Sequence, residues 1–459
     1  MAANRLTSLD ASFLDVETSA AHMHVGWAAT LAPPRDGPAP SFEQLRDHIA
    51  RRLCRAPRYR QRLANVPLGL GRPVWVDDSE FDIDRHVRRS PNGDLTELAE
   101  TVMSSPLARD RPLWELWIAD RLDGGGIGVV GKAHHCMVDG IAAVELGALL
   151  LDPEPESSPD EPDDWTPEPA PAAPRLLLEG VVDRVREELD LVRLPVSAAT
   201  SPRRAGSLLM RAGNALASSF APTPPARVLN DRLSPYRRLV ATRRPLDDLK
   251  RVKRAFGTTL NDVVLAVSAG ALAGYLSEHD QEPRRLKTMV PVNVRSDGAA
   301  DNLGNRISFM FLELPCNEPD PVRRLMELHA ATSERKRRGD PEGSDAVLDL
   351  VSRAPSRLQR AVSRLVTSPR TFNLVVSNIP GPQEPLYMLG CELIDAYPVV
   401  PLADRHTLSI GFTTVAGRAC FGLYADRDAL PDAEALATHL DVSIEELLER
   451  SADREAVPA

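Results

Sequence analysis

The stretch GKAHHCMVDG, Gly131 to Gly140, raises the central chemical question of this chain. Two adjacent histidines, His134 and His135, follow the apolar run IGVVG and precede an Asp-Gly pair. Upstream, LWELWIADRL and IGVVGKAHH flank DGGG, a pattern that predicts a β-hairpin. Downstream, IAAVELGALLLD predicts a helix. We therefore expect the histidines at the end of a strand, in a turn that can face a cleft.

The histidine stretch allows several chemical interpretations. A metal could bind His134, His135 and Asp139, but no other His or Cys cluster supplies further ligands. Cys136 could act as a nucleophile, yet adjacent residues of an extended segment point to opposite sides, so His135 would not readily activate it. One histidine could serve as a general base, because its pKa lies near neutrality. From the residues alone, this last interpretation and a purely structural role both stay open.

Two other catalytic patterns fail on context. GIGVVG matches the dinucleotide pattern G-x-G-x-x-G, but its first glycines belong to the expected hairpin turn and the rest to a strand. The chain contains no G-x-S-x-G sequence, which argues against a serine hydrolase of that type. We therefore expect chemistry without a covalent intermediate.

Length and composition indicate a globular protein with two domains. The chain has 459 residues, of which 43% are hydrophobic and 26% charged. Its net charge of −10 argues against a nucleic-acid partner. The five cysteines are scattered, which is typical of reduced thiols, and the N-terminus lacks a signal pattern. We therefore expect a cytoplasmic location.

One boundary is clear from composition. Residues 152–174, DPEPESSPDEPDDWTPEPAPAAP, hold eight prolines and eight acidic residues, a composition typical of an extended linker. We predict a first half over residues 1–152, a linker with amphipathic connecting helices over 153–235, and a second half over 236–459. The segment LLLEGVVDRVREELDLVRL has the spacing of a helix that lies on a lipid surface or packs against the domains.

The second half mixes helices and strands without regular βαβ alternation. PLDDLKRVKRAFG predicts an amphipathic helix that ends at Gly257, and TTLNDVVLAVSAGALAGYL predicts an apolar helix capped by Thr258 or Thr259. The expected strands are KTMVPVNV, RISFMFLEL, TFNLVVS and TLSIGFTTV followed by ACFGLYAD. This pattern predicts an α+β fold.

The histidine stretch and five further motifs resemble those of a known family. HHCMVDG is similar to the HHxxxDG motif of coenzyme A-dependent acyltransferases of the chloramphenicol acetyltransferase-like superfamily. Five further motifs resemble the bacterial wax ester synthase/diacylglycerol acyltransferases and occur in that family's order. They are LTSLDASFLDVET with MHVGW, RPLWELW, the ND of NDVVLAVSAGALAGYL, NVRSDGAADNLGN and SNIPGP.

The resemblance implies a fold and a mechanism. It implies two chloramphenicol acetyltransferase-like domains, each a mixed sheet flanked by helices, with an active-site tunnel between them. His135 would be the general base for direct attack of a hydroxyl on an acyl-CoA thioester, and His134 would shape the site. Asp139, followed by the motif's Gly140, would form a structural ion pair with Arg295. This pair would hold the catalytic turn of the first half against the second half.

For each of the other motif residues, two alternative roles stay open. Ser377 and Asn378 either donate hydrogen bonds to the oxyanion or form a turn. Asn261 and Asp262 either contact substrate or cap a helix. Pro112 and Trp114 either contact substrate or pack the domain. The same two roles stay open for His22 and His24.

The resemblance implies an acyl-CoA-dependent O-acyltransferase that makes triacylglycerol, wax ester or both. Acyl-CoA would be a co-substrate, and we expect no bound cofactor and no metal. The acceptor would be diacylglycerol or a long-chain alcohol, and the protein would attach peripherally to a membrane or lipid inclusion. The alternatives are another lipid or polyketide hydroxyl as acceptor, or an idle lipid- or CoA-binding protein on the same fold.

Overall fold

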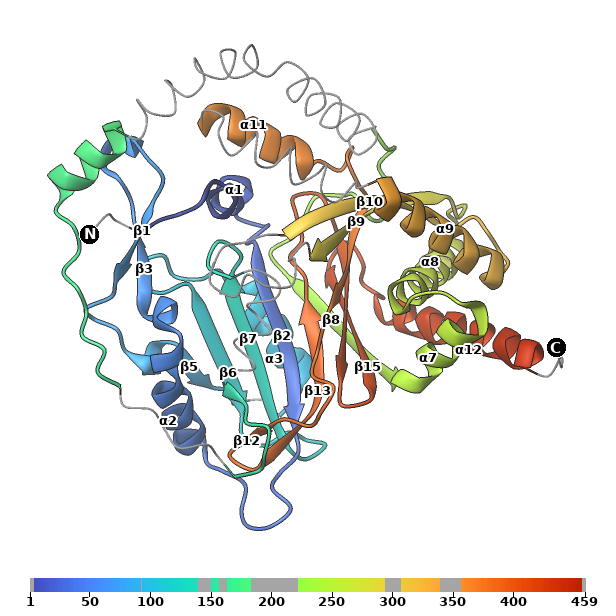
Figure 1. Cartoon of the computed structure of the whole chain (residues 1–459), viewed down its shortest axis with the longest axis horizontal. Coiled ribbons are helices and arrows are strands. Elements are labelled where there is room, and N and C mark those ends of the chain that lie inside the picture. Colours follow the sequence, from blue (N-terminus) through green and yellow to red (C-terminus); the bar gives the residue numbers. More distant parts are fainter. Residues whose placement is uncertain are drawn as a thin grey trace.

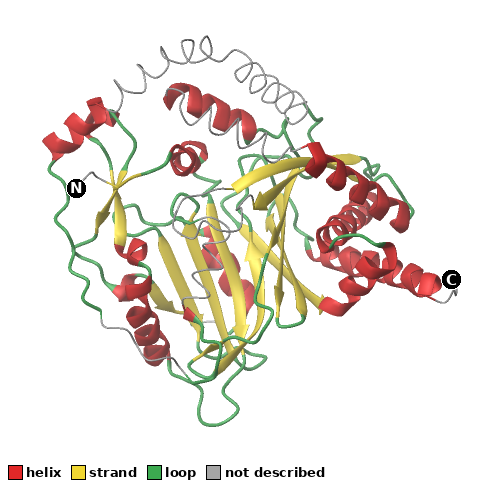
Figure 2. Ribbon diagram, viewed as in Figure 1, coloured by secondary structure: helices red, strands yellow, loops and turns green. Residues whose placement is uncertain are grey.

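A computed structural model describes residues 4–91, 93–138, 150–156, 163–182, 222–293, 307–338 and 356–455. Two six-stranded mixed sheets lie side by side in it, and helices cover their outer sides (Figure 1, Figure 2). A small three-stranded sheet, β1-β4-β3, lies beside the first of them. Its strands are β1 (Asn4–Arg5), β3 (Gln61–Ala64) and β4 (Val74–Asp77).

The first large sheet has the strand order β12-β13-β2-β7-β6-β5. Its strands are β2 (His24–Leu31), β5 (Val87–Arg89), β6 (Trp114–Ala119), β7 (Ile127–His134), β12 (Tyr387–Met388) and β13 (Cys391–Val399). Strands β6 and β7 pair antiparallel, with Trp114 opposite Ala133. The predicted hairpin is confirmed, and Gly125 and Gly126 in its turn take the positive φ values that glycine tolerates best.

The second large sheet has the order β10-β9-β11-β14-β15-β8. Its strands are β8 (Arg237–Pro245), β9 (Arg285–Asn293), β10 (Ile307–Pro315), β11 (Leu374–Ile379), β14 (Leu408–Val415) and β15 (Arg418–Asp426). All the strands predicted from the sequence of this half are present. Strand β11 runs parallel to both of its neighbours, which makes this sheet mixed.

Four helices cover the outer face of the second sheet: α7 (Leu246–Phe256), α8 (Leu260–Glu278), α9 (Pro321–Arg338) and α12 (Glu434–Glu455). Both predicted helices are confirmed. Gly257 ends α7 in the left-handed conformation, and Thr259 forms a capping box with Asp262 at the start of α8. Helix α8 is long and apolar enough to cross a membrane, but most of it is buried in the core of this half.

The remaining described helices belong to the first half and to the region around the junction. They are α1 (Ser8–Val16), α2 (Phe42–Arg52), α3 (Leu95–Ser104) and α11 (Ser356–Val366), and residues 173–182 are also helical. Helix α3 packs between the sheets, where Leu98 and Val102 share a core with Leu239 and Tyr424. The helix predicted directly after HHCMVDG lies outside the described residues, apart from its end at Leu150.

The sheets are not built from contiguous halves of the chain. Strands β12 and β13 come late in the sequence, yet β13 pairs with β2 in the first sheet. Its Pro398 packs against Gly411 and Gly422, which are cross-strand partners in the second sheet. A Cβ at Gly422 would collide with the Pro398 carbonyl, so the two sheets approach this closely only because both side chains are absent.

A buried ion pair fastens the end of the first half. The Arg52 guanidinium and the Asp152 carboxylate lie 2.6 Å apart with almost no exposed surface. The backbone of Asp152 also exchanges hydrogen bonds with Tyr387 of β12. The pair therefore joins α2 to the strand that the late part of the chain contributes.

We expect Asp152→Ala to lower the free energy of unfolding by about 3–5 kcal/mol, because it leaves the Arg52 charge buried without its carboxylate. Urea unfolding followed by circular dichroism measures the change. Asp120→Ala is the control, since Asp120 pairs with the largely exposed Arg89 at 2.6 Å. An exposed pair contributes about 0–1 kcal/mol, so equal losses in the two variants would contradict the prediction.

Candidate active site

The two histidines end β7 and begin the turn that follows it. His134 is the last residue of the strand and lies opposite His24 of β2. The His135 N–H donates to the Met23 carbonyl at 2.9 Å, and the His134 N–H donates to the Leu113 carbonyl at 2.9 Å. The backbone carbonyls of the residues that directly precede β2 and β6 therefore hold the turn.

Met23 takes an unusual backbone conformation. Its φ of 50° lies in the left-handed region, which a non-glycine residue seldom adopts, and its side chain is buried. Such strain persists only where surrounding contacts compensate for it. Here the conformation directs the Met23 carbonyl to the amide of His135.

The ring of His135 stacks on Phe13 of α1. The ring centroids are 3.7 Å apart and the planes differ by 8°. His135 as a whole residue is half-buried, and the Nδ1 atom of its ring is buried. Asp139, Gly140 and Arg295 lie outside the described residues, and their predicted roles, including the Asp139–Arg295 ion pair, stay predictions.

His134 is fully buried, and its contacts with neighbouring residues fix the orientation of its ring. Its Nδ1 accepts the Cys136 N–H at 3.1 Å, so the ring proton sits on Nε2, which lies 3.8 Å from a Glu17 carboxylate oxygen. Glu17 pairs in turn with Arg109. Burial lowers the pKa of His134 well below its usual value, and the Arg109 charge lowers it further. His134 is therefore neutral at physiological pH and suited to shaping the site.

His22 and His24 extend this cluster of imidazoles. The ring centroids of His24 and His134 are 6.4 Å apart, and those of His22 and His24 are 5.2 Å apart. Burial lowers the pKa of both residues, most strongly that of His24, which also feels the charge of Lys132. All three rings are thus uncharged at neutral pH and enclose the site without adding positive charge.

The geometry also bears on the rival interpretations of the stretch. Cys136 is buried, and burial raises the pKa of its thiol, which disfavours the thiolate that a nucleophile needs. Residues 127–131 of GIGVVG lie in β7, which confirms the expectation that this stretch is a strand and not a dinucleotide-binding loop. Among the described residues, no three His, Cys, Asp or Glu side chains converge as metal ligands would.

An apolar cavity of about 250 Å³ lies where the two sheets meet. It follows β2 from Val25, next to His24, to Leu31 near the far end of the strand. Strands β7, β13 and β14 contribute further walls, including Val129, Leu393 and Val415. Six residue steps along β2 correspond to about 20 Å, the scale of a long acyl chain rather than an acetyl group.

The SNIPGP motif borders this cavity. Ser377 and Asn378 belong to β11 and pair with Gly411 and Phe412 of β14. Ile379, Gly381 and Pro382 line the cavity directly. A Cβ at Gly381 would collide with the Thr414 carbonyl, so glycine lets this loop close against β14. The oxyanion role of Ser377 and Asn378 stays a prediction, now for residues adjoining the cavity wall.

The PLW motif packs the first half. Trp114 is buried, stacks on His86 with centroids 4.7 Å apart, and donates from Nε1 to the Tyr59 carbonyl at 2.8 Å. Leu113, between Pro112 and Trp114, supplies the carbonyl that holds His134. Neither Pro112 nor Trp114 is among the described residues that line the cavity, and substrate contact by them stays a prediction.

The ND motif fixes the start of α8. Asp262 is fully buried and accepts hydrogen bonds from Thr332 and His329 at 2.7 Å each, as well as from the Thr259 N–H at 2.9 Å. Burial alone would raise its pKa, but these hydrogen bonds hold the pKa below its usual value. The geometry accounts for Asp262 as a capping residue that joins α8 to α9. A contact of Asn261 or Asp262 with substrate stays a prediction.

Several residues of the site were not singled out from the sequence. Phe13 and Glu17 lie inside LDASFLDVET, so the signal was present, but a motif does not say which of its members meets the histidines. Met23 is the first residue of MHVGW, but the motif does not reveal that its backbone carbonyl accepts the His135 amide, and Arg109 carried no local signal, because its contact with Glu17 arises from the fold.

Comparison with known proteins identifies the family. Residues 6–264 match the wax ester synthase/diacylglycerol acyltransferase catalytic domain, and residues 303–448 match the WS/DGAT C-terminal domain. A relative from Mycobacterium tuberculosis named "Probable diacyglycerol O-acyltransferase" is 33% identical over 463 residues, which cover 97% of this chain and 96% of that protein.

Solved structures agree with this assignment. The wax ester synthase/diacylglycerol acyltransferase from Marinobacter aquaeolei VT8 is 26% identical, with a TM-score of 0.71 over 98% of this chain and 100% of that one. The trichothecene 15-O-acetyltransferase of Fusarium sporotrichioides is 13% identical, with a TM-score of 0.64 over 97% and 94%. That second likeness shows the fold alone.

The predicted α+β fold of two chloramphenicol acetyltransferase-like domains is confirmed by these neighbours. The two matched domains together span well over half of the sequence, and their order is the order in which the motifs occur. The chain is an acyltransferase and belongs to the wax ester synthase/diacylglycerol acyltransferase family.

Proposed function

We propose that this acyltransferase transfers a long-chain acyl group from acyl-CoA to the hydroxyl of diacylglycerol, a long-chain alcohol or both. The observation that carries the proposal is the apolar cavity that follows β2 for about 20 Å from Val25, whose cross-strand partner Ala133 directly precedes His134. An almost wholly apolar wall suits an alkyl chain, because each buried methylene contributes about 0.8 kcal/mol. The family and its named relatives point to the same acceptors.

His135 acts as the general base in this proposal. The acceptor hydroxyl gives its proton to the imidazole as its oxygen attacks the thioester carbonyl carbon. The tetrahedral intermediate then collapses, the carbon–sulfur bond breaks, and the imidazolium returns the proton to the departing thiolate of coenzyme A. Two observations support His135 in this role: the stacking on Phe13 that fixes the ring plane, and the backbone hydrogen bond to Met23.

The same proposal covers the chain's partners and location. Acyl-CoA is a co-substrate, and the reaction needs neither a bound cofactor nor a metal, because the proton moves only between hydroxyl, imidazole and thiolate. We propose a cytoplasmic protein that attaches peripherally to a membrane or lipid inclusion. The exposed apolar side chains of Leu178, Val181 and Val182 on the helix of residues 173–182, together with Leu68, support attachment to a lipid surface.

We expect His135→Ala to lower the rate of coenzyme A release from palmitoyl-CoA by about 10² or more, because the base is lost. The measurement uses the full chain with diacylglycerol and hexadecanol as separate acceptors, and thermal unfolding establishes that the variant is folded. The ratio of the two wild-type rates identifies the preferred product.

His279→Ala is the matched control, since His279 lies at the end of α8 and pairs with Asp432. It should retain the wild-type rate. A His135→Ala variant as active as the wild type would refute the role of His135 as the general base. A wild type that is inert with both acceptors but active with another lipid hydroxyl would replace the proposed acceptor, and one inert with every hydroxyl would favour the idle binding protein.

We expect Ala29→Phe to shift the acyl chain length that the enzyme accepts. Ala29 lines the cavity about four residues along β2 from Val25, so a phenyl ring there blocks the far part of the channel. The value of kcat/KM should fall at least about 10-fold for palmitoyl-CoA and remain unchanged for butyryl-CoA. Thr30→Phe, on the opposite face of the same strand and half-buried, is the control. An equal loss for both thioesters would mean that the acyl chain lies elsewhere.

A further inference from the structure

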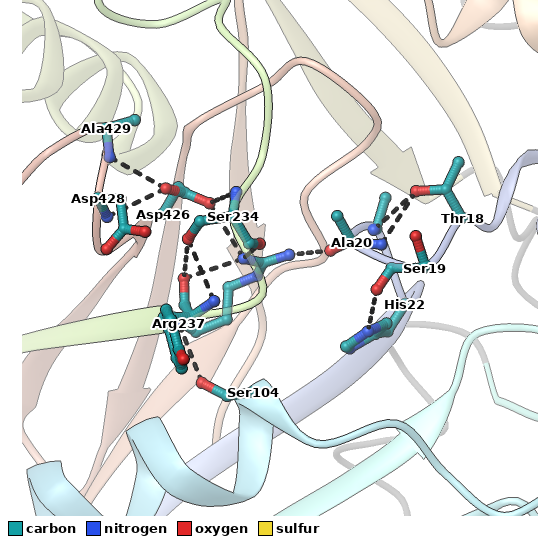
Figure 3. A network of polar contacts seen from close by, with 12 residues as sticks. Thr18, Ser19, Ala20, His22, Ser104, Ser234, Arg237, Asp426, Asp428 and Ala429 are labelled. Carbon is teal, nitrogen blue, oxygen red and sulfur yellow. Dashed lines mark hydrogen bonds and ion pairs between the residues drawn. The ribbon is translucent and has the colours of Figure 1, made fainter.

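A buried arginine lies at the junction of the two halves (Figure 3). Arg237 begins β8, and its guanidinium lies 3.1 Å from the Asp426 carboxylate at the end of β15. Their side chains are 3% and 1% exposed. The same guanidinium donates to the carbonyls of Ser234 and Tyr236 at 2.7 and 3.0 Å. The second half thus holds this side chain firmly in one orientation.

Asp426 is itself fixed by backbone donors. Its carboxylate accepts the N–H of Ser234 at 2.6 Å and those of Asp428 and Ala429 at 3.1 and 3.0 Å. A carboxylate held in this way cannot follow a moving partner. Arg237 therefore takes its position from a rigid anchor within its own sheet.

The arginine then reaches into the first half. A guanidinium N–H donates to the Ala20 carbonyl, and the backbone N–H of Arg237 donates to the Ser104 hydroxyl at 2.9 Å. Ala20 belongs to a tight turn in which the Thr18 hydroxyl accepts the N–H groups of Ala20 and Ala21 at 3.3 and 2.9 Å. The arginine thus fastens a turn that lies directly before β2.

The residues that follow this turn contact the backbone of the proposed base, His135. The segment continues from Ala20 through Ala21 and His22 to Met23, whose carbonyl accepts the His135 amide at 2.9 Å. Met23 holds a left-handed φ of 50°, a conformation that relaxes unless its flanking segment is restrained. On one side that restraint is the β2 ladder, and on the other it is the turn that Arg237 holds.

We propose that Arg237 is a positioning residue for the acyl transfer: held by Asp426, it fixes the 18–23 turn and thereby the backbone of His135. The proposal rests on the proposed function of His135 as the base. Arginine suits the task because its planar guanidinium presents several donors in fixed directions, so it serves Asp426 and Ala20 at once. A lysine ammonium on the same stem keeps the charge beside Asp426 but cannot reach both acceptors.

The test compares two variants that loosen the turn from opposite sides. Arg237→Lys keeps a charge for Asp426, and Thr18→Val changes an exposed residue, so both should fold. For palmitoyl-CoA and hexadecanol we expect kcat to fall about 10-fold to 10²-fold with both KM values unchanged, because the base is displaced and binding is not. The double variant should lose no more than about the larger single loss, since both act on one turn.

Arg243→Lys is the matched control. Arg243 lies on the same strand β8 and pairs with Asp395 of β13, so it also joins the two sheets, but far along the strand from the turn. It should keep the wild-type kcat. If it lowers kcat as much as Arg237→Lys does, or if both turn variants keep the wild-type kcat, the positioning role is overturned.

Hydrogen exchange of the His135 amide separates this proposal from the mechanism on which it rests. In Arg237→Lys its exchange should accelerate at least about 10-fold, while the amides within the β6–β7 ladder exchange at the wild-type rate. Unchanged exchange at His135 would overturn the positioning role whatever the kinetics. Faster exchange together with a fully active His135→Ala would instead mean that Arg237 holds the turn but that His135 is not the base.

Discussion

The contact of Pro398 with the Gly411–Gly422 pair determines how the two sheets meet. Two glycines opposite each other remove both side chains from one point of the β14–β15 ladder, and the backbone of β13 fills that point. Because β13 is paired with β2, this contact also places β2 and its neighbour β7 against the second sheet. The apolar cavity occupies the space that remains beside the contact, and Pro398 is one of its walls.

The environment of the histidines follows from the same arrangement. His24 begins β2 and His134 ends the adjacent strand β7, and both are buried, so burial lowers the pKa of both and keeps them neutral. The charges closest to them are arranged as pairs, Glu17 with Arg109 and Lys132 with Glu115. The proposed base His135 therefore lies next in sequence to a buried ring that carries no charge of its own.

The sequence allowed the local elements to be predicted but not the contacts between distant segments. The β6–β7 hairpin, the end of α7 at Gly257 and the cap of α8 at Thr259 depend on turn and capping chemistry within a few residues, and all three are confirmed. The insertion of β13 into the first sheet has no such local signal, since its partner β2 lies more than 360 positions away. For the site, the motif indicated the histidines. Met23 acts through its backbone carbonyl, which any residue carries, and the Arg237 guanidinium meets the Ala20 carbonyl across 217 positions of sequence.

The two buried arginine–aspartate pairs differ in what their geometry can do. Arg52 and Asp152 join α2 to the strand bridge at Tyr387, and a well-packed apolar pair could replace such a contact without loss of stability. Arg237 and Asp426 carry the same desolvation cost, but the guanidinium also donates to Ala20 across the junction. An apolar substitute would leave that carbonyl without its donor and the turn before Met23 without its restraint. Because of its desolvation cost, a buried ion pair contributes little to stability. The role of the Arg237–Asp426 pair is instead to set an orientation, because it fixes the 18–23 turn of the first half relative to β8 of the second half.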